Sequence, residues 1–137
     1  MNNDAPAHIK DTINLFNTYR ASKNIIKCGT DLITDKENVD YEYKKAEKII
    51  KLVDNAILRM CFNSKDGNRY ARTLFYRYLS DTIYSEKQII NILKHEQIAK
   101  SKPTYHRLRK QGLCAACAII YKDEINFDLI GEIKFPE

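Results

Sequence analysis

Apolar residues recur every three or four positions along most of this chain, a spacing that predicts amphipathic helices. The most regular run lasts nearly three heptads and predicts one long helix, whose apolar stripe is widened by Ile49 and Leu58. Such a helix can form the core of a small bundle or one half of a dimer seam. We favour the bundle because sustained coiled coils are usually longer. The run consists of Tyr43, Ala46, Ile50, Val53, Ile57 and Met60.

The segment before this run has the same helical spacing. One amphipathic helix is expected over residues 9–26, with a break at Gly29 and a polar connection over residues 34–38. Only four glycines and three prolines occur in 137 residues, which is few for a β-protein, and 44% of the residues are hydrophobic. The chain is therefore expected to fold as an all-α protein with a modest core.

The long helix is followed by a turn and an aromatic segment. Residues 63–68 are interpreted as a turn, in which Asp66 and Gly67 tolerate positive φ. In residues 69–79, three arginines stand among aromatic and aliphatic residues. This composition suits either a surface that stacks nucleic-acid bases or a core helix with arginines reaching to the solvent, and the helical spacing favours the core helix.

Two capped helices are predicted next. Ser85 and Gln88 form a capping-box pattern, and Tyr84 stands where a hydrophobic staple would pack. Ser101 is a second cap candidate, and Pro103 lies in the first helical turn, where proline costs little. Two short helices in succession, the second of them basic, predict a helix-turn-helix.

The second of these helices is expected to have one packing face and one basic face. Its packing face should hold Tyr105, Leu108 and Gly112. Residues 94–110 contain six Lys or Arg and one Glu, so their net charge of +5 equals that of the whole chain, which has 23 basic and 18 acidic residues. A local excess of this kind suits a phosphate-binding surface, although a solvated helix face would also carry it. The opposite face should hold Pro103, His106, Arg107 and Lys110.

These features predict a sequence-specific regulator that binds double-stranded DNA. His106 and Arg107 are the best candidates for reading base edges, while Lys102 and Lys110 suit phosphates. The expected DNA-binding residues are Lys100, Ser101, Lys102, Thr104, His106, Arg107, Arg109 and Lys110.

The segments 72–79, 88–93 and 101–113 resemble the ArpU-like family of phage-encoded transcriptional regulators from Gram-positive bacteria, whose C-terminal half is similar to region four of sigma factors. The resemblance implies activation of late phage or prophage genes. This chain departs from the family pattern in two places. Leu93 and Ser101 are eight residues apart rather than about three, and Gly112 stands where alanine is usual.

An alternative hypothesis makes the basic helix a docking surface for an acidic partner, such as the bacterial RNA polymerase or a phage assembly protein. A small terminase-like packaging subunit would be a DNA-binding variant of this alternative. A homodimer through the seam at residues 43–60 is also open. An enzyme is not expected, because the chain has no Gly-rich phosphate loop, no HExxH motif and no nucleophile elbow.

Neither a cofactor nor a metal site is expected. Cys114 and Cys117 form a CxxC motif inside an apolar helical segment, and the single Cys28 and Cys61 offer no matching second pair. We interpret all four as reduced thiols, with the CxxC pair packed in the core. No signal peptide or apolar membrane span is visible, so the protein is expected in the bacterial cytoplasm.

Three parts of the chain are distinguished. Residues 1–62 are expected to form a helical scaffold, and residues 63–121 the helix-turn-helix region. Residues 122–137 alternate apolar and polar positions, and are expected to form an extended tail or a short β-hairpin.

Overall fold

The computed structural model describes residues 8–28, 39–63 and 65–122. Within these residues the chain forms six α-helices, one π-helical turn and no β-strand, which confirms the all-α prediction. The elements are α1 (Ile9–Asn17), α2 (Tyr19–Cys28), α3 (Val39–Asn63), α4 (Gly67–Leu74), η2 (Phe75–Leu79), α5 (Glu86–His95) and α6 (Lys102–Lys122). Of the predicted tail or hairpin, Lys122 is the last residue of α6, and residues 123–137 lie outside the described residues.

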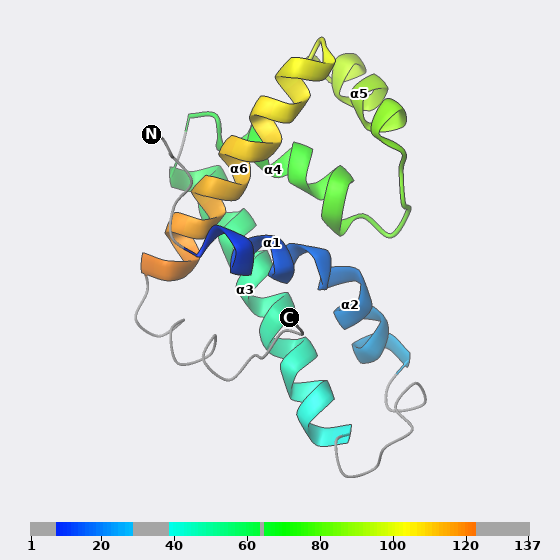
Figure 1. Ribbon diagram of the computed structural model, residues 1–137, viewed down its shortest axis with the longest axis vertical. Helices are drawn as coiled ribbons and strands as arrows, with labels where there is room; N and C mark the ends of the chain where they lie inside the picture. The colour runs from blue at the N-terminus through cyan, green and yellow to red at the C-terminus, as the bar shows by residue number, and fades with distance from the viewer. Residues whose placement is uncertain (1–7, 29–38, 64, 123–137) are drawn as a thin grey trace.

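The helices surround the long α3 and the long α6. Figure 1 shows α1 crossing α3 and α2 lying beside it, while α5 and α6 meet at one end of the molecule. The most extensive contacts between helices are those of α2 with α3 and of α4 with α6. α4 also packs on α3, so it joins the scaffold to α6.

Two apolar clusters form the core, and α6 contributes to both. The larger cluster joins residues of α1, α3, α4 and η2 to Leu113, Ala116 and Ile120 of α6. The smaller one joins α5 and the connection after it to Tyr105 and Leu108 of α6. The larger cluster therefore contains residues from both sides of the boundary expected after residue 62.

The predicted long helix is confirmed as α3, but one residue of its stripe was assigned wrongly. Ala46, Val53 and Met60 are buried. Leu58 was expected to widen the stripe, yet it is 57% exposed. At 100° per residue it lies about 160° from Met60, on the opposite side of the helix.

The N-terminal helix is divided, whereas one continuous helix was predicted over residues 9–26. α1 ends at Asn17 and α2 begins at Tyr19. The Thr18 hydroxyl donates to the carbonyl oxygens of Asn14, at 2.9 Å, and Leu15, at 3.1 Å. A threonine hydroxyl that bonds back to carbonyls of the preceding turn bends a helix, which explains the interruption.

Gly67 is required for a reason other than the one predicted from the turn. It is the first residue of α4 and is helical rather than at positive φ. A Cβ atom at this position would lie 1.8 Å from the Met60 carbonyl oxygen. Glycine is therefore needed because the backbones of α3 and α4 approach too closely for any side chain.

The aromatic segment forms α4 and then the π-helical turn η2. The Ser80 N–H donates to the Phe75 carbonyl oxygen at 2.8 Å, the wide pairing of a π-turn. Arg20 of α2 closes the end of this turn by donating to the carbonyl oxygens of Ser80, at 2.8 Å, and Arg77, at 3.3 Å. Leu74 and Tyr78 are buried, as the prediction of a core helix requires.

Candidate nucleic-acid interface

The first helix of the candidate interface begins at the predicted cap. The Ser85 hydroxyl accepts from the Gln88 N–H at 3.2 Å, and the Gln88 side chain accepts from the Ser85 N–H at 2.8 Å. Tyr84 packs on the cluster that contains Ile89, as expected of a hydrophobic staple. The capping box is therefore confirmed.

The eight-residue interval between Leu93 and Ser101 is occupied by a helix end and a short connection. α5 continues to His95. The Ile98 N–H then donates to the Leu93 carbonyl oxygen at 2.8 Å, and the Gln97 N–H to that of Lys94 at 3.1 Å. This is the Schellman pairing, which needs one residue in the left-handed region, here Gln97 at φ 61°.

α4 fixes this connection from beside it. The Arg72 guanidinium binds both carboxylate oxygens of Glu96, at 3.1 and 2.8 Å, and the Tyr76 hydroxyl also donates to Glu96. Arg69 donates to the Ile98 carbonyl oxygen at 2.7 Å. The hydrogen bonds and positive charge of Arg72 hold the pKa of Glu96 below its usual range. The orientation of α5 relative to α6 is thus fixed by two arginines that were predicted only to reach the solvent.

α6 begins where the sequence predicted. The Ser101 hydroxyl accepts from the Thr104 N–H at 3.4 Å. Tyr105 and Leu108 are 1% and 2% exposed, so the predicted packing face is confirmed. Gly112 lies against α4, where a Cβ atom would be 3.2 Å from both Leu74 Cδ1 and Tyr70 Cβ.

The expected DNA-binding residues lie together on the first three turns of α6 and the turn before it. Thr104, His106 and Arg109 are half-buried. Glu96, the single acid in residues 94–110, is occupied by Arg72. The basic charge of this surface is therefore not offset by an acid of its own segment. The exposed members are Lys100, Ser101, Lys102, Arg107 and Lys110.

His106 is held by an acid that the sequence did not indicate. Its Nε2 atom lies 2.6 Å from Oε1 of Glu86 in the first turn of α5. Both side chains keep more than a third of their surface exposed. This contact fixes the imidazole beside α5, whereas Arg107 has no such restraint among the described residues. Glu86 and His106 are twenty residues apart, so only the α5–α6 packing brings them together.

A groove of about 490 Å³ lies between α1, η2 and the first half of α6. Its lining is apolar along α1, where Ile9 and Ile13 contribute, and cationic at Arg77, Arg109 and Lys110. Burial raises the pKa of the Tyr105 hydroxyl, while the positive charges of Arg109 and Arg77 oppose that rise. The sequence did not predict this groove, because its residues come from three distant segments.

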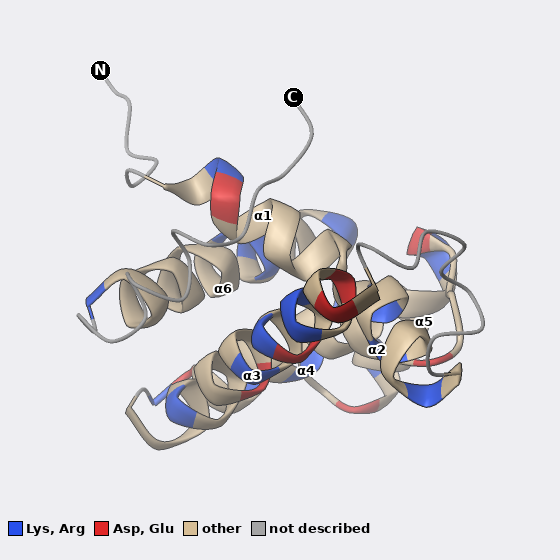
Figure 2. Ribbon diagram, turned by 90° about the horizontal axis from the view of Figure 1, so that it is seen from below, with Lys and Arg blue, Asp and Glu red and all other residues tan. Residues whose placement is uncertain are grey.

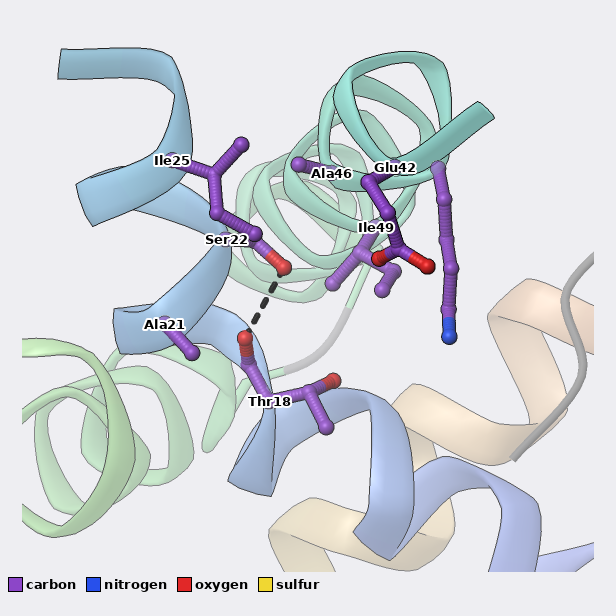
Figure 3. Close-up of a pocket in the computed structure, with 8 residues that line it drawn as sticks. Thr18, Ala21, Ser22, Ile25, Glu42, Ala46 and Ile49 are labelled. Carbon is purple, nitrogen blue, oxygen red and sulfur yellow. Dashed lines mark hydrogen bonds between the residues drawn. The ribbon is translucent and has the colours of Figure 1, made fainter. Parts of the chain in front are cut away.

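A smaller cavity of about 150 Å³ lies between α2 and α3 (Figure 3). Its lining includes Ala21, Ile25, Ala46 and Ile49, and the Ser22 hydroxyl beside it donates to the Thr18 carbonyl oxygen at 2.9 Å. The other lining residues are Thr18, Glu42 and Lys45, and the Thr18 hydroxyl is also bonded, to the carbonyl oxygens of Asn14 and Leu15. We interpret this cavity as a packing gap between the two helices.

The CxxC cysteines lie on α6 but differ in exposure. Cys117 is 2% exposed and burial raises the pKa of its thiol, as the packed-thiol interpretation requires. Cys114 is half-exposed and lines the groove. In the part of the chain that the structure describes, no group of His, Cys, Asp and Glu side chains could hold a metal ion.

The charge of α3 differs from that of the candidate interface. Figure 2 shows bands of Lys or Arg and of Asp or Glu following one another along α3.

Among the described residues, no helix combines the length and apolar composition that a membrane crossing requires. Comparison with family models, curated proteins and solved structures gives no match for this chain. The resemblance to the ArpU-like family stays a prediction.

Proposed function

We propose that this protein is a sequence-specific regulator that binds double-stranded DNA through a helix-turn-helix formed by α5 and α6. The observation that carries the proposal is the α5–α6 pair itself, two capped helices whose connection α4 holds through Arg72 and Arg69. The exposed side of α6 supplies to a duplex cations that have no ion pair among the described residues. Late-gene activation in a phage or prophage remains the expectation drawn from the family resemblance.

Within this proposal the residues divide by exposure. Arg107 projects from the exposed face of α6 and is assigned to base edges, because a guanidinium can bind guanine through two hydrogen bonds. Lys102 and Lys110 are assigned to phosphates. His106, beside Glu86, is assigned a restrained contact at the edge of the interface.

The test is selection from random duplex DNA at a stated salt concentration near physiological, followed by binding measurements on α6 variants. Arg107→Ala should cost about 1–3 kcal/mol on the selected site and relax preference at one position. Lys110→Ala should weaken all duplexes alike and reduce the salt slope by about one. Lys44→Ala, an exposed lysine on α3, is the matched control and should change neither.

Two results would contradict the proposal. One is the absence of any enriched motif, with binding that only fades as salt rises, which would favour a packaging role or an acidic protein partner. The other is unchanged DNA binding in both α6 variants, which would remove α6 from the interface.

A further inference from the structure

The groove between α1, η2 and α6 combines cations with apolar surface and contains no acid among its described lining residues. The Arg109 Nε atom is buried there without a hydrogen-bond partner among the described residues. Arg77 lies over the Tyr78 ring, with its guanidinium 4.8 Å from the ring centre. Neither arginine has an acidic partner in the described part of the chain. The groove therefore suits an occupant that carries carboxylates and apolar side chains together.

The C-terminal segment of this chain has that composition. Residues 123–137 contain five acidic residues and one lysine, a net charge of −4. Since the whole chain carries +5, the preceding residues carry +9. Between the acids stand Ile125, Phe127, Leu129, Ile130, Ile133 and Phe135.

The attachment point lets this segment reach the groove. It follows Lys122, the last residue of α6, and Lys110 in the groove lies twelve residues earlier on the same helix. At 1.5 Å per helical residue that separation is about 18 Å, which about six extended residues span. Asp128 and Glu132 are therefore the first acids that can reach Arg109 and Lys110. A tethered segment is also present at an effective concentration in the millimolar range, so weak ion pairs can hold it.

We propose that residues 123–137 bind in the groove between α1, η2 and α6 and compete with DNA there for Arg109 and Lys110. The binding rests on the charge and lining of the groove, and the competition rests on the proposed DNA-binding function. A carboxylate-rich segment that covers two of the expected DNA-binding residues lowers DNA affinity without changing the helix-turn-helix.

Cys114 reports on the groove without any DNA. Its thiol lines the groove, whereas Cys28 and Cys61 are exposed elsewhere and serve as internal controls. The full chain is alkylated with uncharged iodoacetamide, and each cysteine is followed by mass spectrometry. The tail variant carries Asp128→Asn and Glu132→Gln, and the control of equal charge carries Asp40→Asn and Glu47→Gln on α3.

Alkylation of Cys114 should be about two- to tenfold faster in the tail variant, since exposed ion pairs are individually weak. Arg77→Gln should also increase the alkylation rate of Cys114. In the unaltered chain, added salt should increase the alkylation rate of Cys114 but not that of Cys28 or Cys61. The α3 control should leave all rates unchanged. Equal alkylation rates of Cys114 in the tail variant and the unaltered chain would overturn the proposed binding of residues 123–137 in the groove, regardless of the DNA affinities.

Affinity for duplex DNA is then measured on the same proteins. The tail variant should bind more tightly than the control of equal charge. A faster Cys114 rate with equal DNA affinities would overturn the competition. If no variant binds DNA at all, the proposed function fails, while the alkylation rates still decide whether the segment occupies the groove.

Discussion

Gln97 holds a backbone conformation that only glycine adopts without strain. Its φ of 61° allows the two hydrogen bonds that end α5, and its side chain is exposed. The left-handed region costs a non-glycine residue about 1–2 kcal/mol. The position is occupied by glutamine, so the end of α5 is less stable than its hydrogen bonding permits.

Replacing Gln97 by glycine should therefore stabilise the protein. Relief of the strain exceeds the extra flexibility of glycine in the unfolded chain, so the free energy of unfolding should rise by about 0.5–1 kcal/mol. Urea denaturation measures this change. Gln111→Gly, at an exposed position inside α6, is the matched control and should lower the free energy by about 1 kcal/mol. A loss of stability in Gln97→Gly would contradict the strain.

The caps were predictable from sequence, and this strained residue was not. Ser85 and Ser101 act on N–H groups two or three positions away, so their local pattern carries the information. Glutamine has no preference for positive φ, and it adopts this conformation because Ile98 must be buried beside Leu93. Leu58 was misassigned for a different reason, since helical periodicity already places it about 160° from Met60 and therefore off the buried stripe.

At the scale of elements, α4 holds the α5–α6 connection through a cluster of polar side chains. Arg72 contacts Glu96 through two hydrogen bonds, and Tyr76 contacts the same carboxylate. Both charged side chains retain some exposure, 46% for Arg72 and 26% for Glu96, so solvent weakens their attraction. The cluster nevertheless fixes geometry, because each partner comes from a different segment.

This cluster should make the stability of the connection depend on acid. Because the pKa of Glu96 is lowered in the folded protein, its stabilising contribution is complete above the unfolded value of about 4.3 and is lost as pH falls through the folded value. Glu96→Gln should therefore cost about 1 kcal/mol at neutral pH and progressively less below about pH 4.3. Urea denaturation at a series of pH values measures the difference, with Glu47→Gln on α3 as the control for losing one surface charge. If Glu96→Gln lowered the free energy of unfolding equally at every pH, the charge of Glu96 would not be what stabilises the connection.

The sequence predicted the helices more fully than the contacts between them. Helical spacing indicated α3, α5 and α6 correctly, since burial of one face imposes that spacing. The division at Thr18 was missed because it depends on a hydroxyl that bonds back to the preceding turn, which the apolar spacing does not reveal. The π-turn η2 was missed because it depends on how the neighbouring helices pack. The Glu86–His106 contact was missed because it depends on the packing of α5 on α6. The residues expected at the DNA lie on the first three turns of α6 and the turn before it, but Arg107 and Arg109 are about 160° apart around the helix.

At the scale of the molecule, α6 joins the candidate interface to the helical scaffold. One uninterrupted helix supplies Tyr105 and Leu108 to the smaller apolar cluster and Leu113 and Ile120 to the larger one. Gly112 lies between these pairs, against Leu74 and Tyr70 of α4. A glycine inside a helix costs about 1 kcal/mol relative to alanine, and here it permits the close approach that connects both clusters.

Gly112→Leu should disturb both clusters at once. Its Cβ alone would lie 3.2 Å from Leu74 and Tyr70, so a full side chain must push α6 away from α4. Overpacking of this kind should lower the free energy of unfolding by about 1–3 kcal/mol, although leucine favours a helix. Thermal unfolding followed by circular dichroism should show the loss as one transition. Ala118→Leu introduces leucine at an exposed position of the same helix and should change stability little. If leucine lowered the free energy of unfolding equally at both positions, the close contact between α4 and α6 at Gly112 would not be the cause of the loss.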